Sequence, residues 1–463
     1  MSKKLQTFIE ELSPQARHML VASVEAAKNR GESQPQFDMI LSFARPLVRK
    51  NGVEKPRRDH LMRSFFDPFT QFLFDGSSGL KFPGRIARSS LKPIWIWITR
   101  DVVPGRVDQL MHEFNLKSGN FEESDIAACG EKLRGEVLPT VRAHLKELRE
   151  VPRGYARLAS QLGGMSVIKD LEDLLAIDAR YPVLAAVLEQ MPDVITAHDI
   201  EKDSPVTNRI RRFLTESSGD GDWLAVALLA RLDHPALLVP LAVVLGGTDN
   251  GKALASTPFS VFVRLALHQL EYAVAKVQHD LHVRVPTDQL LESLRAYHLV
   301  QRKLAVEIDL DSAPDWFAIV ASARRDISEA IKAQIEPVAG MVNRTLRHNP
   351  ANEASARFDD YEAEDAERGL AILAEVRRCR ESFALNEVLT VTWRRVEQAL
   401  ELLSAALLET LRKSTGHAAE VVDRKLASAL HFSSMVFGEE YTKTMRRSRA
   451  NALQASSKKA SNG

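Results

Sequence analysis

Two stretches of this sequence carry large apolar residues at alternating steps of four and three, the spacing of one helix side packed against another helix. The first stretch comprises Val263, Leu267, Leu270, Val274, Val277 and Leu281. The second comprises Leu389, Trp393, Val396, Leu400, Leu403 and Leu407. We therefore expect a mostly all-α, multi-helical protein, with short helix pairs in the middle and a C-terminal three-helix bundle or coiled-coil unit.

The length of the chain predicts more than one structural unit, because 463 residues exceed the size at which a single core stops growing. From the helical spacing and the polar stretches between helices, we expect four segments. These are an N-terminal helical unit over residues 1–120, a central multi-helical unit over 121–347, a C-terminal helical bundle over 361–452 and a disordered tail over 453–463.

The cysteine content and the apolar segments indicate a cytoplasmic protein. Cys129 and Cys379 are the only cysteines and lie far apart in the sequence, so neither a disulfide framework nor a zinc site is expected. The N-terminal segment has no continuous apolar run of the secretory type. The most apolar region, residues 223–247, is interrupted by charged residues and prolines, so we expect no membrane span and instead two short helices separated near Pro235.

Residues 65–104 depart most from the average composition, because they concentrate aromatic residues in a chain that is only 6% aromatic. Residues 45–106 contain thirteen Lys and Arg against five Asp and Glu, whereas the whole chain has a net charge of only +1. Such a basic and aromatic patch can dock a protein or contact nucleic acid. The alternative interpretation is that the aromatic residues form a core with the cations at its rim.

We expect partner binding through seven residues of the stretch 57–97. They are Arg57, Arg58, Arg85, Arg88, Lys92, Trp95 and Trp97. Within this stretch, Ile94 to Ile98 is β-branched or aromatic throughout, which suits a strand, but its neighbours favour a helix and we expect the helix. Two short alternations, at residues 282–285 and 306–310, leave open a small hairpin.

The motifs associated with catalysis or metal binding are incomplete. Gly246 to Lys252 matches a phosphate-binding GxxxxGK loop, but Ala253 stands where such a loop needs Ser or Thr, so a helix C-cap is the better interpretation. His268, Glu271, His279 and His282 share one helix side without a complementary set elsewhere. The sequence therefore indicates no catalytic residue, no metal site and no cofactor, although an active site assembled from scattered residues stays open.

We expect an intracellular adaptor that docks a protein partner through the stretch 57–97. The alternative is a nucleic-acid-binding protein that uses the same basic surface without reading base sequence. The C-terminal helices could also support self-association. A second basic cluster, formed by Lys443, Arg446, Arg447 and Arg449, has the spacing of a helix face and suits either an anionic partner or a solvated helix end.

Overall fold

The computed structural model describes residues 58–76, 81–117, 123–348 and 357–461, together with residues 16, 19–21, 23–24 and 40–41. In these residues the fold is mostly all-α, as the spacing of the apolar residues predicts. The only sheet among them consists of two short parallel strands, β1 (Leu73–Phe74) and β2 (Ile86–Ala87). None of the described helices combines the length and the apolar character that crossing a membrane requires.

The chain forms two compact units whose limits differ from the predicted segments. The first unit contains Met1–Asp75 and Ile86–Asp178, and the second contains Gly76–Arg85 and Ala179–Gly463. The segment Gly76–Arg85 belongs to the second unit although both of its neighbours in the sequence belong to the first. The limit between Asp178 and Ala179 falls inside one continuous helix, α9 (Met165–Leu188), so no change in sequence composition marks it.

The first unit is built around the aromatic residues of the segments 65–74 and 95–97. Its helices are α4 (Arg58–Phe66), α5 (Arg88–Trp97), α6 (Arg106–Lys117), α7 (Glu123–Glu150), α8 (Gly154–Leu162) and the first part of α9, with a 3-10 helix η1 (Asp67–Phe72) and a π-helical turn η2 (Ile98–Val102). Helix α4 packs against α7. The rings of Phe65 and Trp95 lie 5.4 Å apart, and both side chains are buried. Ile94 to Trp97 is helical, as expected.

A buried carboxylate marks the start of α5. Asp170 of α9 is fully buried, and its Oδ2 accepts hydrogen bonds from the backbone amide of Ala87 at 3.3 Å and the hydroxyl of Ser90 at 2.5 Å. The first amide groups of a helix lack partners within the helix, so an acceptor there stabilises its beginning. A residue 80 positions away in the sequence therefore supplies the cap of this helix.

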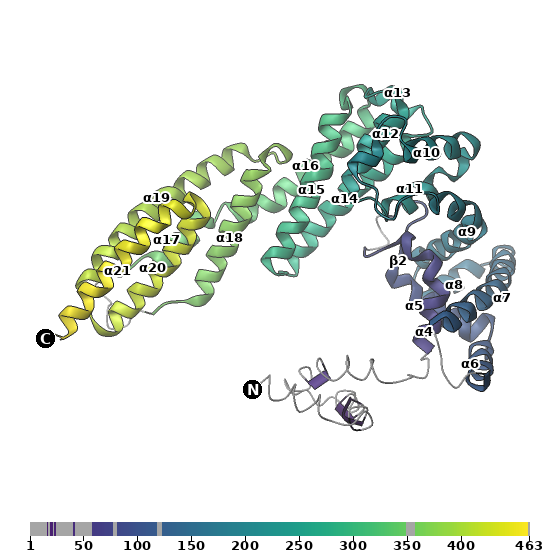
Figure 1. Cartoon of the computed structure of the whole chain (residues 1–463), viewed down its shortest axis with the longest axis horizontal. Coiled ribbons are helices and arrows are strands. Elements are labelled where there is room, and N and C mark those ends of the chain that lie inside the picture. Colours follow the sequence, from purple (N-terminus) through teal and green to yellow (C-terminus); the bar gives the residue numbers. More distant parts are fainter. Residues whose placement is uncertain are drawn as a thin grey trace. The chain divides into compact units, whose positions relative to one another are not determined.

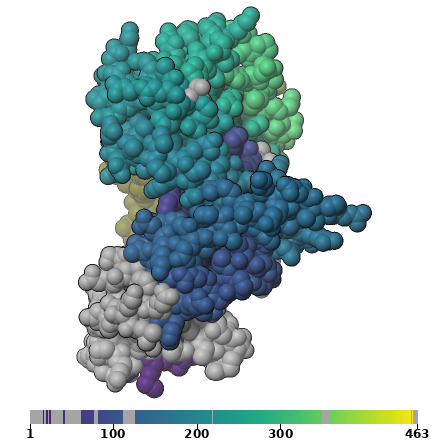
Figure 2. Space-filling view, turned by 90° about the vertical axis from the view of Figure 1, so that its right-hand side faces the viewer, coloured from purple at the N-terminus to yellow at the C-terminus, as the bar shows by residue number. Residues whose placement is uncertain are grey.

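The second unit continues from the end of α9 through a succession of helices (Figure 1). Its first part contains η3 (Ala197–Ile200), α10 (Pro205–Glu216), η4 (Ser218–Asp220), α11 (Gly221–Leu229), η5 (Pro235–Leu237), α12 (Leu238–Gly246), α13 (Gly251–Ala255), α14 (Ser260–His282), α15 (Thr287–Glu307), η6 (Leu310–Ser312) and α16 (Pro314–Ile335). The two short helices predicted on either side of Pro235 are confirmed as α11 and α12. Helix α14 packs against α12, α15 and α16. Figure 2 shows the surface of the teal part of the chain, which contains α10 to α14.

The predicted C-terminal bundle is present and contains more helices than expected. It consists of α17 (Val338–Leu346), α18 (Asp360–Arg378), η8 (Arg380–Ser382), α19 (Asn386–Lys413), α20 (Gly416–Phe437) and α21 (Glu439–Ser461). Gly438, with φ of +84°, divides α20 from α21 and so adds a helix to the predicted three. Helix α21 extends to Ser461 and so covers most of the predicted tail 453–463. Ala452 is buried just before this segment, and within it the hydroxyl of Ser456 donates to the carbonyl oxygen of Ser414 at 2.7 Å.

The hairpin that the sequence left open between residues 282–285 and 306–310 is not formed. His282 is the last residue of α14, and Val283 continues in a helical conformation. Ile308 has an extended backbone. The residue after it, Asp309, forms an isolated parallel β-bridge with Asn250 and not with residues 282–285. Alternating apolar residues at the end of α15 therefore reflect the end of a buried helix rather than a strand.

Candidate functional site

The two tryptophans of the predicted docking stretch are core residues of the first unit. Trp95 is 9% exposed and Trp97 is 2% exposed. The ring of Trp95 lies 6.2 Å from that of Phe66, and the ring of Trp97 lies 5.8 Å from that of His144. Their burial follows from the packing of α5 against other parts of the unit, so these two side chains are not available to a partner in this structure.

Arg85 is also buried, in the second unit. It is 7% exposed, and its guanidinium carbon lies 5.6 Å from the centre of the Tyr272 ring. Burial lowers the pKa of Arg85 to about 10, because a charged group loses hydration inside the protein. Its neighbour Gly84 has φ of +85°, and a Cβ there would meet the Trp223 ring at 2.8 Å, so only glycine fits this close approach.

The exposed part of the predicted docking surface is small. Arg88 and Lys92 lie on the exposed side of α5, and Ile96, one step of four further on, is 45% exposed. Arg88 is paired with Asp75 at 2.8 Å, with both side chains more than half exposed. Arg57 lies outside the described residues. Arg58 is the first residue of α4, but the structure does not describe its side chain. Docking through these residues stays a prediction.

The two sequence motifs that resembled chemical sites have structural roles. Gly247 is the C-cap of α12 with φ of +66°, which agrees with the helix-cap interpretation of the GxxxxGK match. His268 is buried beside the ring of Phe82, with the ring centres 5.7 Å apart. In the described part of the chain, no three potential His, Cys, Asp or Glu ligands gather as a metal site would require.

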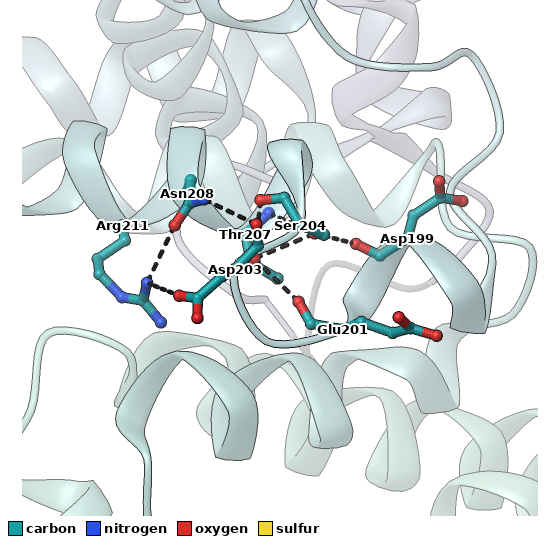
Figure 3. Close-up of polar contacts among 7 residues, drawn as sticks. All are labelled: Asp199, Glu201, Asp203, Ser204, Thr207, Asn208 and Arg211. Carbon is teal, nitrogen blue, oxygen red and sulfur yellow. Dashed lines mark hydrogen bonds and ion pairs between the residues drawn. The ribbon is translucent and has the colours of Figure 1, made fainter.

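The polar residues at the start of α10 form a helix cap (Figure 3). The hydroxyl of Ser204 accepts from the amide of Thr207 at 3.2 Å and donates to the carbonyl oxygen of Asp199 at 2.6 Å. Asn208 donates to the carbonyl oxygen of Asp203, whose φ of +63° is left-handed, at 2.9 Å. These contacts satisfy the first turn of α10 and its preceding loop, so we assign the cluster a role in local folding.

The candidate functional site is a groove along α16 in the second unit, with a volume of about 690 Å³. We call it the α16 groove. Eight residues of α16 line it at alternating steps of three and one, which is one continuous side of a helix. They are Phe317, Val320, Ala321, Arg324, Arg325, Ser328, Glu329 and Lys332. The opposite walls come from the end of α15, from residues 308–311, and from Ala384 and Leu385 before α19.

The lining of the α16 groove changes character along its length. Near the start of α16 it is apolar, with Phe317, Val320 and the neighbouring Leu310, and the Phe317 side chain is 50% exposed. Further along α16 it is charged, with the cations Arg324, Arg325 and Lys332 and the carboxylate Glu329. Two more carboxylates, Asp309 and Asp311, lie on the opposite wall beside Leu310. An exposed aromatic residue beside a concave apolar surface is typical of binding sites.

Hydrogen bonds from α15 and α16 hold the wall that precedes α19. The Tyr297 hydroxyl donates to the carbonyl oxygen of Ser382 at 3.0 Å, and His298 Nδ1 lies 2.7 Å from the Ser382 hydroxyl. From α16, Arg324 Nη2 donates to the carbonyl oxygen of Phe383 at 3.0 Å, and the Ser328 hydroxyl accepts from the amide of Ala384 at 2.9 Å. The groove is therefore formed in advance rather than opened by a ligand.

Two groups behind this wall have pKa values that burial shifts. Burial raises the pKa of the Tyr297 hydroxyl and lowers the pKa of the His298 ring, because both charged forms would lose hydration. Glu381, 3.9 Å from His298 Nε2, opposes the second shift. Both side chains are therefore favoured in their neutral forms, which suits hydrogen bonding within the wall.

No protein-family model matches the chain, and neither the curated proteins nor the solved structures contain a match. The candidate site therefore depends on its own geometry. Reasoning from the sequence missed the α16 groove, although one signal was present. Phe317 directly follows Trp316 and lies outside the buried side of α16, so one large aromatic residue remains for the surface.

Proposed function

We propose that the protein is an interaction or adaptor protein that binds an amphipathic helix of a protein partner in the α16 groove. The observation that carries this proposal is the continuous lining from Phe317 to Lys332 along one side of α16. Fifteen helical steps span about 22 Å, which is the length of roughly four helical turns. The apolar part of this elongated groove, around Phe317 and Val320, suits the apolar side of a partner helix.

The three cations of the groove favour acidic residues on the part of the partner helix that lies against them, whereas Asp309, Asp311 and Glu329 of the same lining favour basic residues beside them. Arg324 is half-buried, and its Nε has no hydrogen-bond partner among the described residues. Arg325 and Lys332 have only surface pairs on their own helix, with Asp326 and Glu336 at 3.6 Å. Such pairs contribute little, so these cations can exchange them for a partner carboxylate. We expect the apolar residues of the partner helix near Phe317 and its acidic residues further along α16.

The wider setting belongs to the same proposal. Cys129 and Cys379 are both buried and neither is part of a disulfide, which supports a function in the reducing cytoplasm. The exposed face of α5 with Arg88 and Lys92 is a second, smaller docking surface for the partner. Self-association through the C-terminal bundle and nucleic-acid binding to the basic surface are the other outcomes that an experiment has to distinguish.

Site-specific photo-cross-linking in cells tests the docking proposal. A photoreactive amino acid at Ala321, which is exposed in the groove, should capture a defined segment of a protein partner. The same amino acid at Ala333, which is exposed on α16 but does not line the groove, is the matched control. We expect the captured segment to be an amphipathic, acidic sequence and to appear with the Ala321 probe alone.

The captured segment, made as a labelled peptide, then gives the affinity by fluorescence polarisation. We expect Phe317→Asp to weaken binding by at least about tenfold, because it places a charge against the apolar side of the peptide. Arg325→Glu should weaken peptide binding by less than Phe317→Asp does. Its effect should be larger for a peptide that carries more acidic residues. Equal capture from both positions, capture of nucleic acid, or unchanged affinity of the Phe317→Asp variant would each contradict the proposal.

A further inference from the structure

Three arginines meet at the corner between α18 and α19, away from the lining of the α16 groove. Arg377 lies in the last turn of α18, Arg380 begins η8, and Arg394 lies in the third turn of α19. Together they line a cavity of about 560 Å³, which we call the arginine pocket. The first turns of α19 form its floor, beginning with Asn386.

In the described part of the chain, none of these three arginines forms an ion pair. The neighbouring Arg378, by contrast, is paired with Glu375 at 3.1 Å. The only carboxylate that lines the pocket is Glu397, and it accepts a hydrogen bond from the indole of Trp393 at 2.6 Å. Three arginines against this one carboxylate leave the pocket with an excess of positive charge.

The basic cluster of α21 shows the opposite arrangement. Lys443 is paired with Glu440 at 2.5 Å and Arg446 with Glu439 at 3.0 Å. Arg449 makes two hydrogen bonds to one carboxylate of α20, at 2.7 Å each. The basic cluster of α21, which is conspicuous in the sequence, is therefore largely neutralised, whereas the arginines of the pocket have no ion pair among the described residues.

Stacking holds one of the pocket arginines in place. The guanidinium carbon of Arg377 lies 3.9 Å from the centre of the Trp393 ring, and this ring is only 9% exposed. A guanidinium stacked on an aromatic face keeps its N–H groups in the plane of the group, where they can bind an oxyanion with two parallel hydrogen bonds. The indole is itself fixed by Glu397, so the donor geometry is set before a ligand arrives.

The start of α19 adds to the positive potential of the pocket, whereas the end of α18 is the negative end of its helix dipole. Leu385 at the N-cap of α19 provides no side-chain cap, so the first amide groups of this 28-residue helix remain available beside Asn386. Cations in the last turn of α18 complement its dipole, which accounts for Arg377. It does not account for Arg394, which lies well inside another helix. A shared anionic ligand explains both positions.

We propose that the arginine pocket binds a small ligand that carries several phosphate groups. Arginine is the side chain best matched to phosphate oxygens, and three of them around one cavity suit a ligand with more than one negative charge. The cavity volume lies in the range of small-molecule sites. The proposal does not depend on the function of the α16 groove, since the two sites share no lining residue.

Isothermal titration calorimetry with sodium tripolyphosphate tests the proposal on the full-length protein at low ionic strength. We expect binding of one tripolyphosphate per chain and weaker binding of sulfate. Arg394→Gln or Arg380→Gln should weaken binding roughly 10- to 100-fold, the effect of losing one or two charge-assisted hydrogen bonds. Arg395→Gln is the matched control, because Arg395 is the next residue on α19, is exposed and does not line the pocket, and it should bind nearly as tightly as the unaltered protein.

A spectroscopic measurement checks the location of the site. A ligand that contacts Arg377 should change the fluorescence of the Trp393 indole beneath it, so Trp393→Phe should abolish the change while the other four tryptophans remain. Failure to bind tripolyphosphate, or an equal loss in Arg394→Gln and Arg395→Gln, would overturn the proposal. So would binding of a single-stranded oligonucleotide without binding of tripolyphosphate.

Vesicles distinguish the two sources of such a ligand. Vesicles that contain a phosphatidylinositol phosphate are compared with vesicles of phosphatidylcholine alone. Sedimentation with the first kind only, reversed by tripolyphosphate and lost in Arg394→Gln, would support the pocket with a lipid headgroup as its ligand. Tripolyphosphate binding without sedimentation would support it with a free phosphate compound.

Discussion

Replacing Glu375 with glutamine should destabilise the second unit in a pH-dependent way. Glu375 is only 4% exposed, and its carboxylate accepts from Arg295 Nε at 2.9 Å, from Arg295 Nη2 at 2.8 Å and from Arg378 Nη1 at 3.1 Å. This carboxylate joins α15 to α18, directly before the wall that lines the α16 groove. The substitution keeps the shape of the side chain and removes its charge.

The expected loss in the free energy of unfolding is about 2 kcal/mol at pH 7. A glutamine oxygen at the Oε2 position can still accept from Arg295 Nη2 and Arg378 Nη1, but the hydrogen bond from Arg295 Nε to Oε1 is lost. The two remaining hydrogen bonds lose their charged acceptor and about half of their strength, so the total loss equals about two hydrogen bonds. Charge-assisted hydrogen bonds contribute roughly 1.5–3 kcal/mol each when fully buried, but Arg295 and Arg378 are 49% and 70% exposed. Water replaces part of each lost contact, which reduces the contribution to about 1 kcal/mol per bond.

The pH dependence follows from the pKa of Glu375, which the hydrogen bond from Arg295 lowers. In the unfolded chain this carboxyl titrates near its ordinary pKa of about 4.3. The stabilisation is therefore fully present above that pH and disappears as the pH falls through the lower pKa of the folded state. The difference between the unaltered protein and the Glu375→Gln variant should shrink over the same range, because glutamine does not titrate.

Urea-induced unfolding, followed by circular dichroism at pH 7 and at two values below 4.5, measures both effects. If the two units unfold in separate transitions, only the transition of the second unit should shift. Glu307→Gln is the control, because Glu307 forms a half-buried pair with Lys303 one turn away on the same helix, at 2.8 Å, and the substitution should cost no more than about 0.5 kcal/mol. Equal losses for both substitutions, or a loss for Glu375→Gln that is unchanged at low pH, would refute the reasoning.

Two further substitutions test the wall of the groove and the core of the first unit. Tyr297→Phe should lower the free energy of unfolding by about 1–2 kcal/mol, because it leaves the buried carbonyl oxygen of Ser382 without its donor, and chemical denaturation measures this loss. Trp97→Ala should cost about 3–5 kcal/mol by creating a cavity, whereas the exposed Lys92→Ala should cost less than about 0.5 kcal/mol. Similar melting temperatures for the last two variants would contradict the burial of Trp97.

Helical periodicity was sufficient to predict the fold class. The 4-3-4 spacing on α14 and α19 requires a second helix surface against each, and both helices indeed pack against several others. Other local signals predicted two further features: the neighbours of residues 94–97 predicted their helical form, and the incomplete GxxxxGK motif indicated the helix cap that Gly247 provides. These features depend on residues within a few turns of one another, which is why a single sequence can reveal them.

The candidate sites depended on contacts that no local pattern encodes. Phenylalanine and tryptophan have the same composition signal in a core and in an interface, so the stretch 57–97 could not show which of its side chains were buried. The α16 groove needs α15 and the residues before α19 beside α16. The wall of that groove is held by hydrogen bonds between residues 84 or 85 positions apart, such as the one between Tyr297 and Ser382.

The sequence by itself determined that the described chain is a succession of packed helices, because apolar spacing is a property of each helix alone. Only the tertiary structure decided which charges are neutralised and which are not. Lys443, Arg446 and Arg449 of α21 have acidic partners, whereas none of the three pocket arginines has one among the described residues. The physical reason is that an ion pair forms only between groups within a few ångströms, and folding sets those distances independently of separation along the chain.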